Sequence, residues 1–176
     1  MQAIEPGNVV RVHRGLYDHY AVYLGEELVL QLGGAGLKDK AAASIHYAPF
    51  ADFAKQDAFG VVDLPGQDLA ATVERAIWLC ENPPPVNYHL LAHNCEHVAR
   101  WCATGTAESH QVRDALRVNA AFSVGGVFAV ANRPDSLWAL IGTVALLLLG
   151  LIAKWFSDRD ARRFAKYIHE NYPGSA

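Results

Sequence analysis

A stretch of twenty residues near the C-terminus most constrains what this chain can fold into. Residues 137–156, LWALIGTVALLLLGLIAKWF, carry a single charge, on Lys154. As an α-helix they would span roughly 30 Å, the thickness of a bilayer's hydrocarbon core. Trp138 and Trp155 flank the stretch like interfacial anchors. A buried core helix is the alternative, but a chain of 176 residues has too little else to cover such a helix. We therefore predict a transmembrane helix over residues 137–156.

The segments on either side of this stretch bear on topology. Residues 117–136 include a shorter apolar run, which is a hairpin's first arm, an in-plane segment or a soluble packing helix, with NRPD at 132–135 as the turn. Residues 157–176 form a basic tail, which the positive-inside rule places in the cytoplasm. A single span would leave the preceding domain outside. We therefore favour a hairpin, with a membrane-anchored domain on the cytoplasmic face.

Composition limits the classes of function. The net charge of −3 gives no global positive field for nucleic acid. Three cysteines at irregular spacing do not resemble a disulfide framework, and they suit a reducing compartment or one reactive thiol. The N-terminus has no charged start followed by an apolar run, so we expect no signal peptide.

Residues 1–116 mix strand and helix patterns and predict an α+β domain. Apolar and β-branched runs predict strands, and two of them join through the turn Glu26–Glu27 as a hairpin. The expected strands are residues 8–13, 19–25, 28–32, 44–50 and 60–64. A helix is expected over residues 67–82, capped by Asp68, with Leu69, Val73, Ile77 and Cys80 on one face. A second is expected over residues 95–103, capped by Asn94, with Val98, Trp101 and Cys102 in one stripe.

The stretch HNCEHVARWC, residues 93–102, places Cys95 at the predicted start of this second helix. Unpaired backbone N–H groups and the helix dipole there favour a thiolate and could form an oxyanion hole. His19, at the start of a strand, is the base we select, and Gln31 on the partner strand could orient its ring. The register around a regular turn puts residues 19 and 31 at similar height on one side.

Other readings of these polar residues remain open. His89, His93 and His97 would line one face of a continuous helix and could bind zinc, but such a helix would have to run through Asn94. We therefore expect no metal and no cofactor. Tyr17 and Asn94 are candidates for contact with the substrate or the oxyanion. Glu96 and His97 are expected to be structural partners at the helix start.

Three blocks in this order resemble a known family. HYAVYLGEELVLQL, then NCEHVARWCATG, then SHQVRDAL at 109–116 are similar to the lecithin:retinol acyltransferase-like superfamily, nearest to the phospholipase A/acyltransferase family. These are circularly permuted relatives of papain-like and NlpC-type cysteine enzymes, in which the histidine strand precedes the cysteine helix. The resemblance implies Cys95 as nucleophile and His19 as base. Its third position, usually histidine, falls on Gln31 here.

The resemblance implies acyl transfer through a thioester on Cys95. The acyl chain would come from a glycerophospholipid and pass to water, an amine or a lysolipid, with the membrane as partner. A cysteine peptidase or amidase of NlpC type is the second reading, and a non-enzymatic membrane-inserting protein is the third. Replacing Cys95 by alanine should abolish both catalytic activities and spare insertion. Deleting residues 117–176 should abolish insertion and spare peptidase activity on short substrates.

Overall fold

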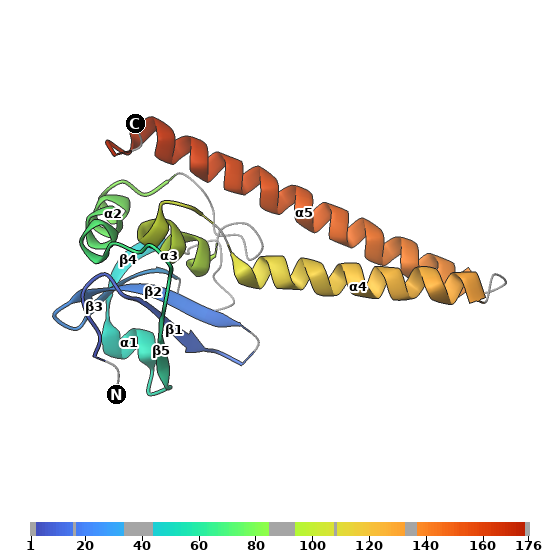
Figure 1. The fold of residues 1–176 in the computed structure, drawn as a ribbon, viewed down its shortest axis with the longest axis horizontal. Helices are drawn as coiled ribbons and strands as arrows, with labels where there is room; N and C mark the ends of the chain where they lie inside the picture. The colour runs from blue at the N-terminus through green and yellow to red at the C-terminus, as the bar shows by residue number, and fades with distance from the viewer. Residues whose placement is uncertain are drawn as a thin grey trace.

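The computed structural model describes residues 3–15, 17–33, 44–84, 94–107, 109–132 and 137–174. Five antiparallel strands form one sheet in the order β4-β3-β2-β1-β5 (Figure 1). They are β1 (Val9–His13), β2 (Asp18–Gly25), β3 (Leu28–Gly33), β4 (Ser44–Pro49) and β5 (Phe59–Val62). The predicted strands and the β2–β3 hairpin are confirmed. The α+β class is therefore confirmed too.

Both faces of the sheet are buried, because apolar side chains along its strands point alternately to one face and to the other. One face, with Tyr20, Val22 and Leu30, packs against the helices α2 (Leu69–Glu81) and α3 (Cys95–Thr104). The other face, with Val29 and Ala48, packs against the short helix α1 (Phe50–Ala54). The sequence analysis did not predict α1.

The helix α2 begins where it was expected but buries a different face. Asp68 caps it by accepting a hydrogen bond from the Ala71 backbone N–H at 3.1 Å. The expected face is wrong, because Ile77 is 39% exposed. The buried positions are Thr72, Ala76 and Leu79, and the small side chains of Thr72 and Ala76 let the helix lie close to α3 and the sheet.

The last two helices form a long antiparallel hairpin that projects from this domain (Figure 1). They are α4 (His110–Asn132) and α5 (Leu137–Asn171), and both are long and apolar enough to cross a membrane. The most apolar window of each is only 6% buried. The predicted turn at 132–135 falls mostly outside the described residues. The predicted span at 137–156 is helical, and the helix continues through the basic tail to Asn171.

The hairpin is arranged with small residues inside and large apolar residues outside. Ser123 and Thr143 are buried between its arms, while Phe122 and Leu149 are exposed. A Cβ on Gly126 would lie 2.5 Å from Thr143 Oγ1, so the arms touch closely there. Transmembrane helices pack in this way, because small residues allow close approach and lipid covers the large ones.

The end of α5 returns to the domain and completes its core. Phe164 and Ile168 are buried in the same cluster as Trp101 and Cys102 of α3. The Phe164 and Trp101 rings meet edge to face at 5.9 Å. The Tyr167 hydroxyl also donates to the Asn82 carbonyl at 3.0 Å, beyond the end of α2. Both ends of the hairpin therefore contact α3, although the two helices diverge as they approach the domain (Figure 1).

Candidate active site

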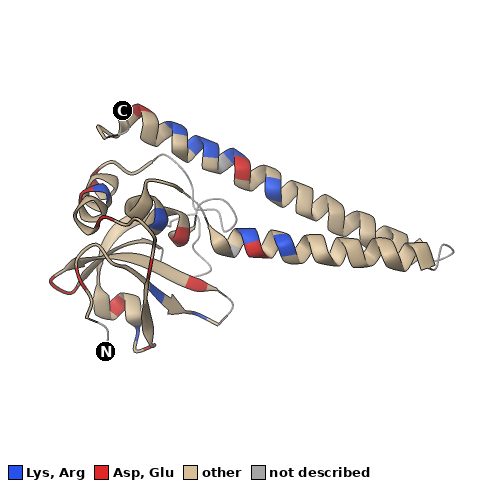
Figure 2. Ribbon diagram, viewed as in Figure 1, with Lys and Arg blue, Asp and Glu red and all other residues tan. Residues whose placement is uncertain are grey.

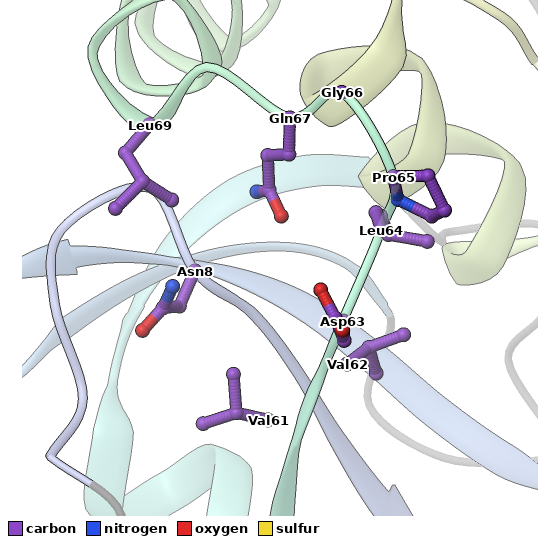
Figure 3. Close-up of a pocket in the computed structure, with 9 residues that line it drawn as sticks. All are labelled: Asn8, Val61, Val62, Asp63, Leu64, Pro65, Gly66, Gln67 and Leu69. Carbon is purple, nitrogen blue, oxygen red and sulfur yellow. The ribbon is translucent and has the colours of Figure 1, made fainter.

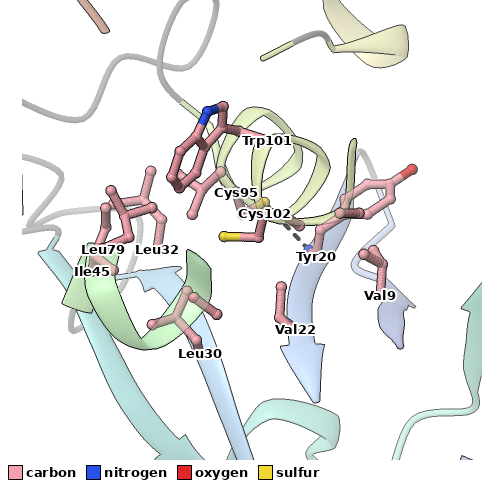
Figure 4. Close-up of a cluster of buried hydrophobic side chains, with 14 of the residues drawn as sticks. Val9, Tyr20, Val22, Leu30, Leu32, Ile45, Leu79, Cys95, Trp101 and Cys102 are labelled. Atoms are coloured by element: carbon pink, nitrogen blue, oxygen red, sulfur yellow. Dashed lines mark hydrogen bonds between the residues drawn. The ribbon is translucent and has the colours of Figure 1, made fainter. Parts of the chain in front are cut away.

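The Cys95 side chain lies in an opening between two strands. The strands β2 and β3 pair only as far as Ala21 and Gln31, so the first residues of β2 have no ladder partner on that side. The Tyr20 backbone N–H donates to Cys95 Sγ at 3.4 Å (Figure 4), and Sγ lies 3.8 Å from the Asp18 carbonyl oxygen. The sulfur thus contacts the backbone on both sides of His19.

The His19 ring lies on the other face of the sheet, 5.3 Å from the Phe53 ring. Its Nε2 is 2.8 Å from Gln31 Oε1, so the predicted pairing of these side chains is confirmed. The predicted register, with His19 level with Gln31, is wrong, because a bulge near Gly25 pairs Gln31 with Ala21. His19 is therefore a diagonal neighbour of Gln31, which a histidine and a glutamine are long enough to bridge.

The series of hydrogen-bonded side chains continues beyond Gln31. Gln31 Nε2 lies 3.2 Å from His46 Nε2, and His46 Nδ1 lies 2.9 Å from the Ser44 carbonyl oxygen. His46 belongs to β4, directly opposite Gln31 in the β3–β4 pairing. Sequence reasoning missed His46. The alternation of β4 could have found it, because His46 and Gln31 face the same side.

Both reactive groups rest in their uncharged forms. Burial raises the pKa of the Cys95 thiol from 9.0 to about 11, although the Tyr20 and Glu96 backbone N–H groups act to lower it. Burial also lowers the pKa of His19 below 6.5, against the effect of the hydrogen bond to Gln31. The expectation that the helix start would favour a thiolate is wrong here, because desolvation of the sulfur is the larger effect.

Buried polar groups fix the start of α3 to the start of α4. Asn94 Oδ1 accepts from the His97 backbone N–H at 3.1 Å, which confirms the predicted cap. Asn94 Nδ2 donates to Ser109 Oγ at 3.2 Å. Ser109 Oγ donates to the fully buried Glu96 carboxylate at 2.6 Å, and Arg100 Nε donates to the same carboxylate at 3.0 Å. Asn94 and Glu96 therefore hold the nucleophile's helix in position.

The remaining predicted residues lie around this site. Tyr17 is half-buried at the start of β2, and its backbone carbonyl accepts from the Arg14 N–H at 2.8 Å. His97 is buried, with its ring 3.1 Å from Asn94 Oδ1. His89 and His93 lie outside the described residues. Among those that are described, no group of three or more His, Cys, Asp or Glu side chains could hold a metal ion.

The family can now be tested against known proteins. A family profile described as "Lecithin retinol acyltransferase" matches residues 2–108, which is more than half of the chain. The chain belongs to the lecithin retinol acyltransferase family. The resemblance seen in the sequence is thereby confirmed, and the matched region contains all of β1–β5 and α1–α3.

Curated relatives point to one branch of this lecithin retinol acyltransferase family. The chain is 29% identical over 139 residues to phospholipase A and acyltransferase 3 of Mus musculus, covering 69% of this chain and 83% of that protein. Phospholipase A and acyltransferase 3 of Pongo abelii is 26% identical over the same shares. That of Homo sapiens is 27% identical, over 64% of this chain and 78% of that protein. The alignments extend beyond the family domain, so they reach toward the hairpin.

One pocket of this family member lies away from the cysteine. It has a volume of about 370 Å³ and lies between the start of β1 and the link from β5 to α2 (Figure 3). Gln67 lines it and donates to the Gly7 carbonyl at 2.7 Å. Its lining residues are Asn8, Val61, Val62, Asp63, Leu64, Pro65, Gly66, Gln67 and Leu69, and none of them belongs to the site around Cys95.

Proposed function

We propose that this protein is a membrane-anchored thiol acyltransferase and phospholipase A that cleaves an acyl ester of a glycerophospholipid. One observation carries the proposal: Cys95 Sγ contacts the backbone on both sides of His19, whose ring is oriented by Gln31. Membership of the family and relatives named phospholipase A and acyltransferase support the choice of a lipid ester.

The tautomer of His19 follows from its hydrogen bond. An amide oxygen can only accept, so His19 Nε2 carries a proton and donates a hydrogen bond to Gln31 Oε1. The unprotonated nitrogen is then Nδ1, the ring nitrogen nearer to the His19 backbone, and Cys95 Sγ contacts the backbone on both sides of this residue. His19 Nδ1 is the base in this proposal, and Gln31 is the residue that orients it.

The reaction has two half-steps. His19 Nδ1 takes the thiol proton as Sγ attacks the ester carbonyl, and backbone N–H groups at the start of α3 stabilise the oxyanion. The lysolipid leaves with the proton from His19, so a thioester remains on Cys95. Water, an amine or a lysolipid then gives a proton to His19 and attacks the thioester, which restores the thiol and releases the new acyl product.

The fold proposed for the domain is the circularly permuted NlpC or papain-like arrangement. The strand with His19 precedes the helix with Cys95 in the chain, which is the permuted order, and the sheet is antiparallel as expected. We assign residues 1–116 to this catalytic domain. Residues 117–136 are assigned to the first hairpin arm, residues 137–156 to the membrane helix and residues 157–176 to the basic tail.

The hairpin is proposed as the membrane anchor, with the catalytic domain on the cytoplasmic face. Its apolar outer surface supports insertion, and both of its ends return to α3. Lys and Arg side chains gather at this domain-proximal end of the hairpin and are absent from the described part of its far end (Figure 2). Protease protection of closed vesicles checks the topology: cleavage sites at both termini should be accessible from the same side.

Intact mass spectrometry tests the chemistry. The full chain in detergent is incubated with a phosphatidylcholine of defined acyl chains, with Cys95→Ser as the matched control. We expect a hydroxylamine-labile adduct with the mass of one acyl group on the native protein alone, together with free fatty acid and lysolipid. The absence of adduct, fatty acid and lysolipid would contradict the proposal.

Two other functions give different outcomes in the same assay. A cysteine peptidase would leave the lipid intact and hydrolyse peptide or cell-wall amides, with the same loss in Cys95→Ser. A protein that acts by membrane insertion alone would release vesicle contents equally well with Cys95→Ala. Cleavage of lipid or of peptide separates the two enzymes, and retention of activity in Cys95→Ala separates membrane insertion from both.

A further inference from the structure

We propose that His46 is a positioning residue that selects the catalytic tautomer of His19 through the Gln31 amide. This inference rests on the proposed function, because it concerns the base of the same reaction. It adds a fourth member, on the strand β4, to the cysteine, the histidine and the glutamine already assigned.

One backbone group, the Ser44 carbonyl, sets the direction of each hydrogen bond in the series that runs through His46 and Gln31 to His19. The Ser44 carbonyl oxygen can only accept, so His46 Nδ1, 2.9 Å away, carries a proton. In a neutral His46 ring the other nitrogen, Nε2, is then an acceptor. Gln31 must therefore direct its NH₂ group at His46 Nε2, across 3.2 Å.

The same amide then has only its oxygen left for His19. Gln31 Oε1 lies 2.8 Å from His19 Nε2, which must donate to it. His19 Nδ1 is left without a proton, and it is the nitrogen that the proposed reaction uses as the base. The Ser44 carbonyl on β4 thus determines, through the side chains of His46 and Gln31, which nitrogen of His19 can act as the base.

The tautomer of His19 has to be selected in this way because residue 31 is a glutamine, whose amide group can turn over. A glutamine amide can turn over and present NH₂ instead of oxygen to His19, and then His19 Nε2 would have to accept. The proton of His19 would move to Nδ1, and the base would be lost. A carboxylate at position 31 has no donor group, so it could only accept from His19 Nε2 and would need no such control. The pairing of Gln31 with His46 in the β3–β4 register therefore has a consequence for chemistry.

The test uses a substitution that reverses one hydrogen bond. His46→Lys places an obligate donor opposite Gln31, which turns the amide and gives His19 the wrong tautomer. Because a general base typically contributes 10²-fold or more, we expect kcat on phosphatidylcholine to fall about 100-fold with little change in KM. His46→Gln restores an acceptor opposite Gln31, so its kcat should stay within about tenfold of native.

A double substitution separates tautomer control from simple disruption of the sheet. The carboxylate introduced by Gln31→Glu can accept from the introduced ammonium and from His19 at once. Gln31→Glu combined with His46→Lys should therefore recover most of the activity lost in His46→Lys alone. Tyr47→Lys is the matched control, because Tyr47 is the exposed neighbour on β4 and faces the other side. It should leave kcat within about twofold of native.

A measurement on the resting protein makes the result independent of turnover. Nitrogen-15 shifts of the His19 imidazole distinguish Nδ1–H from Nε2–H. We expect Nε2–H in the native protein and in the double variant, and Nδ1–H in His46→Lys. An unchanged tautomer in His46→Lys, or a loss of activity that Gln31→Glu does not repair, would overturn the inference. A native protein that carries Nε2–H but never acts on phosphatidylcholine would instead refute the proposed function alone.

Discussion

At the scale of single residues, Cys95 and His19 form an uncharged pair in the resting protein. Cys95 is 4% exposed and its sulfur contacts backbone groups, so the thiol keeps its proton until substrate arrives. A general-base step, in which His19 takes the proton during attack, fits this state better than a preformed thiolate–imidazolium pair. The site thereby resembles a serine enzyme in its protonation, with sulfur in place of oxygen.

Thiol alkylation measures the protonation state of Cys95. A pKa of about 11 instead of 9.0 lowers the thiolate fraction near pH 8 about 100-fold, and the greater nucleophilicity of a more basic thiolate recovers about tenfold. We expect iodoacetamide to modify Cys95 in the folded protein at least about tenfold more slowly than in urea-unfolded protein, as followed by peptide mass mapping. Faster modification in the folded state would contradict a buried neutral thiol.

The pH dependence of turnover reports on His19. Catalysis requires neutral His19, and burial lowers the pKa of this imidazole below 6.5. We therefore expect the midpoint of the acid limb of kcat/KM to lie below pH 6.5. A midpoint above pH 6.5 would show that another group controls the acid limb.

Glu96 is the buried charge on which the helix start depends. Its carboxylate is fully buried and accepts from Arg100, Ser109 and the His110 backbone N–H. Glu96→Gln leaves the largely buried Arg100 guanidinium without its counter-charge, which costs about 3 kcal/mol. For a chain of this size the melting temperature should fall by about 6–12 °C, measured by near-UV circular dichroism. The exposed Glu74→Gln is the control and should leave it unchanged.

Sequence reasoning at this scale found the residues that carry a local signal. Cys95 follows a capping asparagine, and His19 begins an apolar strand, so both could be located from neighbours in the chain. The pKa of Cys95 could not, because desolvation depends on how closely β2 and α3 pack. His46 was missed for a related reason: its partner Gln31 is on another strand, and only the β3–β4 register brings them together.

At the scale of elements, the hairpin depends on close contact at a few small residues. A Cβ on Gly126 would meet Thr143, whereas nothing lies within 4 Å of a Cβ on Gly125. We expect Gly126→Leu to separate the arms and to lower the melting temperature in detergent. Gly125→Leu adds the same apolar surface on the outside, so it should leave the melting temperature within about 2 °C of native. Equal effects of the two substitutions would contradict the observed helix crossing.

Element boundaries were predictable where caps and apolar runs coincide, and helix faces were not. Asp68 and Asn94 mark the starts of α2 and α3 as expected. The buried face of α2 was wrong because the helix uses Thr72 and Ala76 for a close approach, while the larger Ile77 stays exposed. Apolar side chains on a small domain outnumber the places available in its core, so hydrophobicity alone does not select the face.

At the scale of the whole molecule, the apolar hairpin and the α+β domain share one core. Phe164 is 1% exposed although it follows the apolar part of α5 in the chain. Phe164→Ala removes its packing on Trp101 and should cost about 3 kcal/mol, seen as a melting temperature about 6–12 °C lower. Arg163→Ala, at the exposed neighbouring position, is the matched control. Similar effects of both would contradict the docking of α5 on α3.

The shared core changes what a truncation can test. Deletion of residues 117–176 was expected to leave peptidase activity on short substrates intact. That deletion also removes Phe164 and Ile168 and uncovers Trp101, so a loss of activity in the truncated chain would report on folding as well as on membrane insertion. Substitutions on the outer face of the hairpin, such as Leu149→Lys, disturb insertion without opening the core, because Leu149 is 60% exposed.

The return of α5 to α3 also fixes an order of events during synthesis. The ribosome makes the sheet and the nucleophile helix first, but the side chains that close over Trp101 are among the last fifteen residues of the chain. The nascent chain therefore cannot complete its core before the apolar hairpin has been synthesised. Packing around Trp101 is in this way completed last, and a chain released early would remain incompletely packed.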